Sequence, residues 1–432
     1  MRYVDIGILR AKQIEFILSG CYSKEGQTVA DGHYSVSIEN DTLLWCGRCY
    51  DSISFLPQSQ TSHFTLQNVV IGVNFHWERM QNQTFEGELR FIVEEGEVRA
   101  INRLPVENYL ESVISSEMSA TASLEFLKAH TVISRSWLYA QLLRSSEQLH
   151  STLGYEDENE IIRWYAREDH KLFDLCADDH CQRYQGIPKV CNQKVKEAVE
   201  ATSNLVLAYD GKVCDARFSK CCGGVTERFS ACWEDVDFEY LQTFRDCEGK
   251  GDVENLSDEA AARRWIEGSP SSFCNTNDVD VLSQVLNGYD CETNDFYRWQ
   301  VQYTEEQLRQ FVEERSGLSL GRILDLQPVE RASSGRLVRL RIVGEKRAVV
   351  VGKELEIRRW LSPTHLYSSA FVVDKECDAD GNSVFVLKGA GWGHGVGLCQ
   401  IGAAMMGERG YSFSKILEHY YPGAVLKNVF EL

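Results

Sequence analysis

Leu104–Arg135 reads LPVENYLESVISSEMSATASLEFLKAHTVISR, and its periodicity decides the fold. Pro105 suits the first turn of a helix, where its missing N–H would be unpaired in any case. One face of that helix then takes the positions i, i+3, i+4 and i+7, which are Leu110, Val113, Ile114 and Glu117. The pattern predicts an amphipathic helix that buries three apolar side chains and one carboxylate.

Glu117 is the unusual member of this stripe. A glutamate on a buried face must be paired, or else it holds a proton near neutral pH. A proton-holding glutamate is the acid that cleavage of a glycosidic bond requires. The stretch leaves a second interpretation open, in which Glu117 turns to solvent at the helix end or pairs with a nearby base.

A second helix is predicted from Ser123, which is a suitable N-cap, through the apolar and small positions that follow it. Lys128 and Arg135 lie two turns apart on this helix and share a side. With Glu117 they would form an acid beside two cations, suited to an anionic or polyhydroxylated ligand. The alternative is that both are solvated charges on the helix surface.

The segment VENYLESVISSEM…LEFLKAHTVISRSW resembles the catalytic motif of the SpoIID/LytB family, which includes the stage II sporulation protein D and amidase-enhancer proteins. The resemblance implies a lytic transglycosylase that cleaves peptidoglycan glycan strands, favours glycan stripped of its stem peptides, and leaves anhydro-muramic ends. It also implies Glu117 as the catalytic acid and base, and Lys128 and Arg135 as the family's basic positions. A non-catalytic peptidoglycan-binding enhancer of a partner cell-wall amidase is the alternative from the same family.

The C-terminal run Gly389–Ala403 reads GAGWGHGVGLCQIGA. Alternating glycines let a ligand or another strand lie against the backbone. Trp392 offers a face for a sugar ring and His394 offers a hydrogen-bond donor, while a glycine-packed core crossing around a buried Trp392 is the structural alternative. The run resembles the SpoIID signature G-x-GWGHG-x-G-x-x-Q-x-GA. The resemblance as a whole covers about residues 85 to 432.

The run Phe218–Asp246 resembles another family block, in which small hydroxyl residues precede GG-x-T-E. We predict that Ser219 in this run contacts substrate. Cys221 and Cys222 stand where the family has small hydroxyl residues. They are therefore either core thiols or part of an extra metal site with Cys214.

Two histidines and two cysteines fall within a dozen positions at His170, Cys176, His180 and Cys181. Such a set suits tetrahedral zinc. The family resemblance strengthens the prediction, since members that bind zinc carry a similar cluster. Four protein ligands would close the site, which makes the zinc structural and disfavours a zinc hydrolase.

Composition limits the partners and the compartment. The chain has 432 residues and a net charge of −19, which argues against a general affinity for nucleic acid. Its 15 cysteines exclude a fully paired set of intramolecular disulfides. The N-terminus has no signal-peptide pattern and no stretch reaches the length of a membrane span. The family implies the cell envelope, so either a leader has been removed from this sequence or the protein works in the cytoplasm.

We predict an α+β fold, with a mixed or antiparallel β scaffold, a few helices and a β-rich N-terminal segment over residues 1–84 before the SpoIID-like region 85–432. Short strands alternate with turns through the first hundred residues. Cys46 and Cys49 form a CxxC pair without a partner pair, which favours ordinary thiols at a turn. Thr304 and Gln307 predict a capping box, and Leu256–Asn275, rich in Ser, Asp and Glu, is expected to run over the surface.

Overall fold

A computed structural model describes residues 2–72, 78–119, 121–143, 154–165, 170–178, 181–187, 193–249, 254–285, 295–377, 381 and 383–432. The chain forms two compact units, each built from two segments. The first unit comprises Met1–Ala120 and Arg167–Ser203, and the second comprises Thr121–Ala166 and Asn204–Leu432.

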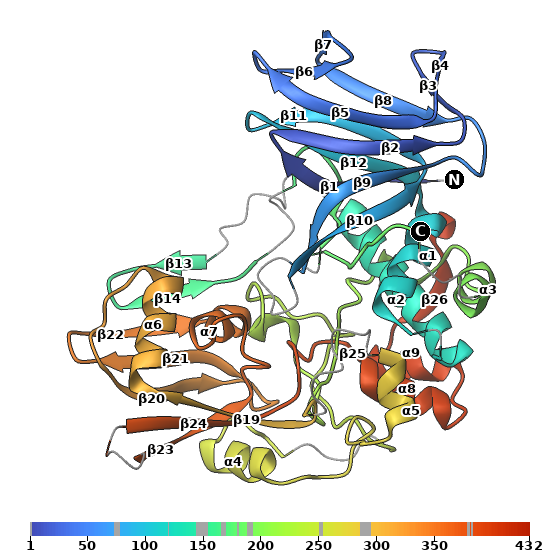
Figure 1. The fold of residues 1–432 in the computed structure, drawn as a ribbon. Helices are drawn as coiled ribbons and strands as arrows, with labels where there is room; N and C mark the ends of the chain where they lie inside the picture. Colours follow the sequence, from blue (N-terminus) through green and yellow to red (C-terminus); the bar gives the residue numbers. More distant parts are fainter. Residues whose placement is uncertain are drawn as a thin grey trace. The chain divides into compact units, whose positions relative to one another are not determined.

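The first unit contains two sheets, drawn mostly in blue in Figure 1. One has seven strands in the order β15 (Leu175–Cys176), β1 (Tyr3–Ala11), β12 (Glu97–Pro105), β11 (Glu88–Glu94), β8 (Ser52–Pro57), β3 (Tyr22–Lys24) and β4 (Gln27–Val29). The other has six, in the order β10 (Arg79–Glu86), β9 (His63–Ile71), β2 (Gln13–Ser19), β5 (Gly32–Glu39), β6 (Thr42–Trp45) and β7 (Arg48–Tyr50). The pairings are antiparallel except that of β1 with β15.

Aromatic side chains join the two sheets into a sandwich. The ring of Phe16 on β2 lies with its centroid 5.4 Å from that of Phe55 on β8 and 5.1 Å from that of Phe91 on β11. All three side chains are buried. Phe16 and Phe55 alternate with more exposed neighbours along β2 and β8, as expected of a sheet with one face on the core.

The predicted N-terminal strands are confirmed. Residues 14–18, 33–38 and 88–93, for example, lie within β2, β5 and β11. Cys46 and Gly47 form the two-residue turn between β6 and β7, with φ of 48° and 73°. Cys46 and Cys49 are both exposed, so the CxxC pair is a hairpin turn with ordinary thiols.

The first unit also holds helix α1 (Val106–Glu117), which contacts helix α3 (Gln193–Ala201). Strand β12 runs directly into α1, with Pro105 as the N-cap rather than within the first turn. The predicted apolar stripe of α1 is buried: Leu110, Val113 and Ile114 have no exposed surface. Helix α3 likewise buries one face, formed by Val195, Ala198 and Val199.

The second unit contains several smaller sheets. The largest has the order β13 (Gly154–Glu156), β14 (Glu160–Arg163), β22 (Ala348–Gly352), β21 (Leu337–Gly344) and β20 (Ile323–Arg331). A three-stranded sheet joins β19 (Arg298–Thr304), β24 (Ser383–Ala390) and β23 (Phe371–Cys377). The others are β17 (Lys212–Val213), β16 (Leu205–Tyr209) and β26 (Val425–Asn428), and the parallel pair β18 (Phe218–Ser219) and β25 (Leu398–Cys399).

Helices complete the second unit. They are α2 (Leu124–Leu143), α4 (Glu259–Glu267), α5 (Val279–Val285), α6 (Glu305–Ser316), α7 (Glu354–Trp360), α8 (Gln400–Glu408) and α9 (Phe413–Tyr420). One hydrophobic core is shared by the five-stranded sheet, the sheet of β19, β24 and β23, and helices α6 and α7, with Trp299, Trp360 and Phe371 among its buried residues. The predicted α+β class, with mainly antiparallel sheets, is confirmed.

In this unit, short sequence patterns agree with the local structure. The Thr304 hydroxyl accepts a hydrogen bond from the Gln307 N–H, and the Gln307 side chain accepts one from the Thr304 N–H, so the capping box of α6 is confirmed. Ser123 is the predicted N-cap of α2, and its hydroxyl accepts a 3.4 Å hydrogen bond from the Phe126 N–H. Strands β20 and β21 form an antiparallel hairpin around the turn residues Ser333 to Gly335.

The prediction for Leu256–Asn275 was wrong. The segment contains α4, which buries Ala262 and Ile266, and it also buries Phe273 and Cys274. Its Glu259 and Glu267 lie on the solvent side of this amphipathic helix and Asp258 is the N-cap, whereas Ser272 beyond the helix is buried. Composition alone therefore concealed a packed face.

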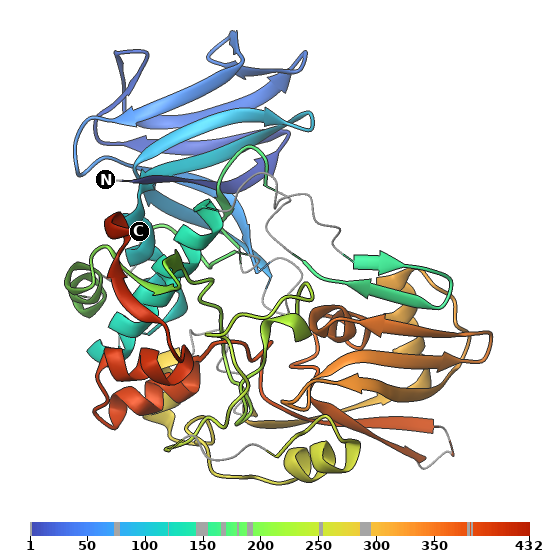
Figure 2. The ribbon, with the colours of Figure 1, turned by 180° about the vertical axis from the view of Figure 1, so that it is seen from behind.

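Helix α2 packs against α8, α9 and β16, and Figures 1 and 2 both show these elements side by side. His130 of α2 and Gln400 of α8 are buried with their side-chain nitrogens 3.2 Å apart. This contact joins the N-terminal motif to the C-terminal glycine run. Among the helices of the described residues, none combines the length and hydropathy needed to cross a membrane.

Candidate functional site

Glu117 is the last residue of α1 and lies on the buried face of this helix. Its side chain is 9% exposed, and the Arg183 backbone N–H donates a 3.4 Å hydrogen bond to its Oε1. Met118 follows in extended conformation, with its N–H bonded to the Ile114 carbonyl. The carboxylate is therefore held at the C-terminal end of the helix, facing the segment 181–187 of the same unit.

That segment also lines a pocket of about 290 Å³ in the first unit. Arg183, Tyr184 and Gln185 form one wall, and Arg99 contributes a second guanidinium. His170, Cys176 and Asp178 also line it. The segment beside Glu117 thus continues into a pocket next to the predicted metal ligands, in which Arg99 is paired with Glu94.

Three of the four predicted zinc ligands come together. One ligand atom each from His170, Cys176 and Cys181 lies within 4.8 Å of the others, a spacing that tetrahedral zinc with histidine and thiolate ligands can span. The parallel pairing of β15 with β1 positions Cys176, and the Cys181 N–H donates a hydrogen bond to the Asp178 carbonyl. His180 lies outside the described residues.

Lys128 and Arg135 belong to α2, in the second unit, whereas Glu117 belongs to the first. The Lys128 ammonium lies 2.8 Å from the Glu125 carboxylate. The Arg135 side chain is completely buried and donates a 3.0 Å hydrogen bond to the Leu205 carbonyl. Their predicted association with Glu117 stays a prediction.

In the glycine run the backbone crosses closely over another segment, and every second residue from 391 to 397 has to be glycine. Gly391, Gly393, Gly395 and Gly397 all have φ between 72° and 93°, a region that favours glycine. A Cβ at residue 397 would lie 2.0 Å from the Arg217 carbonyl oxygen, and one at residue 391 would lie 2.8 Å from the Cys221 carbonyl oxygen. The run pairs with the segment 217–223 through Trp392 and Cys221, which exchange backbone hydrogen bonds.

This crossing brings the three predicted substrate contacts, Ser219, Trp392 and His394, into one loop region. The Ser219 hydroxyl accepts a 3.2 Å hydrogen bond from the Gly395 N–H. Trp392 and His394 are half-buried. Burial and, next in effect, the Arg217 guanidinium lower the pKa of His394 well below its usual value. The neutral ring accepts a hydrogen bond at Nδ1 from the Val396 N–H, which places its proton on Nε2.

Sequence reasoning missed several residues that surround His394. The Trp233 ring meets the imidazole edge-on at 5.0 Å, and the Arg217 guanidinium lies 4.3 Å from the centre of the Trp233 ring. The Arg336 side chain donates to the Gly393 carbonyl. These residues come from loops, where the sequence has no periodic pattern. Only Arg217 offered a signal, because it lies two residues before Ser219.

Two families match parts of this chain. Residues 94–209 match the family described as Stage II sporulation protein, and residues 227–397 match a domain of unknown function. The matched range 94–209 includes Glu117, Lys128, Arg135 and the predicted zinc ligands. The resemblance predicted from the motifs is confirmed, since residues 94–209 match the SpoIID family.

Curated relatives extend this similarity over most of the chain. A Stage II sporulation protein D of Bacillus amyloliquefaciens is 23% identical over 325 residues, 75% of this chain and 74% of the relative. The Amidase enhancer of Bacillus subtilis is 26% identical over 328 residues, 73% of this chain and 40% of the relative. An uncharacterized protein of Brachyspira hyodysenteriae is 25% identical over 339 residues, 78% of this chain and 71% of the relative.

Proposed function

We propose that this protein acts on the bacterial cell wall as a lytic transglycosylase that cleaves peptidoglycan glycan strands, with Glu117 as its acid and base. The observation that carries the proposal is the Glu117 carboxylate, almost fully buried at the end of an apolar helix face and within the SpoIID-family domain. The names of the relatives, Stage II sporulation protein D and Amidase enhancer, support a role in the cell wall.

The chemistry needs one carboxyl group. Glu117 gives its proton to the glycosidic oxygen as the bond from that oxygen to the muramic anomeric carbon breaks. The muramic hydroxymethyl oxygen then bonds to the same carbon and returns its proton to Glu117, which leaves an anhydro-muramic end. Because the nucleophile is part of the sugar, the site needs no second carboxylate to activate water, unlike two-carboxylate hydrolases.

The surroundings of Glu117 support this role. The Arg183 N–H hydrogen bond fixes the carboxylate, and Arg183 also lines the adjacent pocket, where it could meet an anionic sugar. Zinc held by His170, Cys176 and Cys181 would have a structural role, because it would hold in place the segment that carries Arg183. Lys128 and Arg135 are proposed to act with Glu117, as the family resemblance implies.

Glu117→Gln tests the proposal because glutamine keeps the size and loses the proton. We expect cleavage of denuded sacculi to fall by about 10²–10⁴-fold, the usual contribution of a general acid or base, with folding and glycan binding unchanged. Mass analysis of the released ends should show anhydro-muramic ends, lighter by one water than hydrolysed ends. Glu111→Gln, on the same helix, is the matched control and should keep activity. Full activity of the Glu117 variant would reject the transglycosylase assignment.

A second candidate function is a non-catalytic enhancer of a cell-wall amidase, which the Amidase enhancer relative favours. In that case wild-type protein releases no glycan fragments from denuded or intact sacculi. It would instead raise the rate at which an added amidase releases stem peptides, and Glu117→Gln would raise it equally. The same set of digestions therefore separates the two functions.

A further inference from the structure

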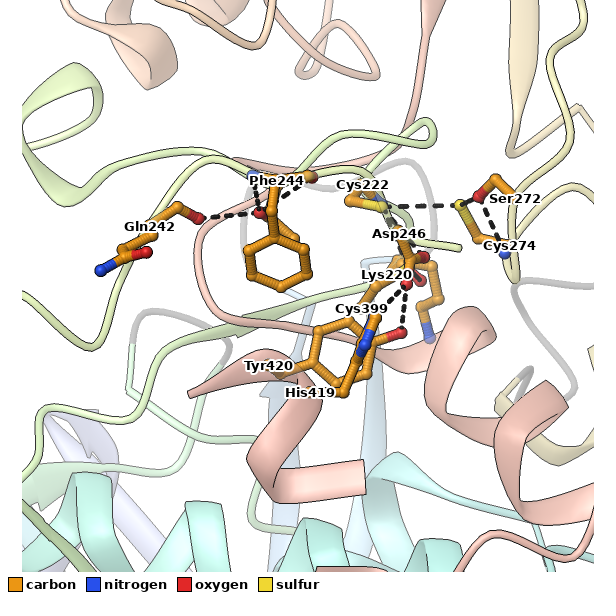
Figure 3. Close-up of polar contacts among 11 residues, drawn as sticks. Lys220, Cys222, Gln242, Phe244, Asp246, Ser272, Cys274, Cys399, His419 and Tyr420 are labelled. Carbon is orange, nitrogen blue, oxygen red and sulfur yellow. Dashed lines mark hydrogen bonds and ion pairs between the residues drawn. The ribbon is translucent and has the colours of Figure 1, made fainter. Parts of the chain in front are cut away.

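A second group of possible metal ligands lies in the second unit and shares no residue with the proposed catalytic set. Its members are one carboxylate and three thiols, contributed by four separate segments: Cys222, Asp246, Cys274 and Cys399. One ligand atom from each lies within 4.8 Å of the others, and every one of these residues is at most 3% exposed. Figure 3 shows their side chains converging between loops and the start of α8.

The spacing within the group suits a tetrahedral ion. Cys222 Sγ lies 3.5 Å from Cys274 Sγ and 3.3 Å from Asp246 Oδ2. Tetrahedral zinc with Zn–S of about 2.3 Å and Zn–O of about 2.0 Å separates two sulfurs by about 3.8 Å and a sulfur from an oxygen by about 3.5 Å. Small outward movements of the sulfurs would therefore admit the ion.

Asp246 is already oriented as a metal ligand would be. Its Oδ1 accepts hydrogen bonds from Tyr420 Oη at 2.8 Å and from His419 Nε2 at 3.1 Å, which leaves Oδ2 directed at the thiols. Such outer hydrogen bonds fix the direction of metal-binding carboxylates. Gly402 makes room for this arrangement, because a Cβ there would lie 2.6 Å from Asp246 Oδ2.

The thiols are also supported by donors. The Cys222 N–H donates to Cys399 Sγ at 3.2 Å, and the Ser272 hydroxyl lies 3.1 Å from Cys274 Sγ. Cys399 is the N-cap of α8, where the helix dipole favours a thiolate. A purely apolar core would need none of these polar contacts, and it would not bury a carboxylate among sulfurs.

We propose that Cys222, Cys274, Cys399 and Asp246 form a closed, structural zinc site that is separate from the predicted site at His170. Asp246 and Cys274 belong to the matched domain of unknown function, whereas Cys222 and Cys399 flank it. The ion would therefore join the chain on either side of this domain to residues within it. Cys214, which the sequence offered as one possible partner of Cys221 and Cys222 in an extra metal site, does not belong to the group.

Metal content of the full-length protein, purified with reductant, tests the proposal. We expect two zinc ions per chain in the wild type and one in the double variant Cys176→Ser/Cys181→Ser, which leaves the new group intact. Cobalt substituted into that variant should show the intense visible bands of a tetrahedral ion and thiolate-to-metal charge transfer. Cys222→Ser/Cys399→Ser should remove the other zinc, and Cys214→Ser, a buried thiol outside both groups, should retain two.

Other outcomes overturn the proposal. A Cys176→Ser/Cys181→Ser protein without zinc would do so, whether its remaining thiols are free or a Cys222–Cys274 disulfide appears in non-reducing peptide maps. If that variant does not fold, zinc X-ray absorption of the wild type decides. The group at His170 supplies two sulfurs, so an average above two sulfur ligands per zinc supports the second site, and two or fewer rejects it.

Discussion

At the scale of single residues, Trp392 shows how a signature side chain can be held by its neighbours and still face solvent. Its ring lies 4.8 Å from that of Phe296 and 4.5 Å from that of Tyr367, measured between centroids, and the residue remains half-buried. The sequence offered a buried core residue or an exposed sugar platform. The structure supports parts of both, since one side packs on aromatic rings and part of the side chain is accessible.

We expect Trp392→Ala to lower the free energy of unfolding by about 2–3 kcal/mol, less than for a fully buried tryptophan because part of the ring is already in water. Denaturant unfolding measures this loss. Binding of the folded variant to denuded sacculi should fall as well. Trp392→Phe keeps the aromatic contacts and should lose less than about 1 kcal/mol. Wild-type stability of the alanine variant would contradict the packing that the structure describes.

At the scale of elements, the glycine run between β24 and α8 has a fixed backbone path. Gly397 has φ of 72° and would place a Cβ 2.0 Å from the Arg217 carbonyl oxygen. Gly410, after α8, has a similar φ of 80° but has no atom within 4 Å of the position of its Cβ. A comparison of alanine variants at Gly397 and Gly410 therefore separates the cost of backbone strain from the cost of steric overlap.

Gly410→Ala should cost about 1–2 kcal/mol, the strain of a left-handed alanine. Gly397→Ala carries the same strain and also forces β18 and β25 apart, so we expect a loss of more than about 3 kcal/mol or failure to fold. Thermal and denaturant unfolding of the two variants, compared with wild type, provide the measurement. Equal losses in both would show that the crossing at Arg217 is looser than described.

At the scale of the whole molecule, the predicted zinc at His170, Cys176 and Cys181 should act on stability more than on chemistry. Because the ligands come from a loop packed on β1, the ion would hold that loop to the first unit. Cys181→Ser is expected to remove one zinc per chain and to lower the midpoint of thermal unfolding by about 5 °C or more. The rate at saturating glycan should change little.

Cys46→Ser serves as the control, since this thiol is exposed in a hairpin turn of the same unit. It should keep the metal content and the unfolding temperature of the wild type. Calorimetry and metal analysis on freshly reduced protein give both quantities. Wild-type zinc content in Cys181→Ser would remove Cys181 from the ligand set.

The sequence by itself determined the elements whose signals are local. The i, i+3, i+4 pattern of α1, the N-cap of α2, the capping box of α6 and the hairpin of β20 and β21 each depend on residues a few positions apart, where helical and turn geometry fix which side chains meet. The group at His170, Cys176 and Cys181 was predictable for the same reason, since a dozen residues can bring their ligands together within one loop.

Only the tertiary structure brings together the second group of possible metal ligands and the residues around His394. Cys222 meets Asp246, Cys274 and Cys399 from 24, 52 and 177 residues away in the chain. Trp233 and His394 also come from distant segments. The entropy of closing a long loop depends only weakly on its length, so spacing carries almost no information about such contacts. Packing of loops around the glycine crossing brings these side chains together, and no periodicity in the sequence records it.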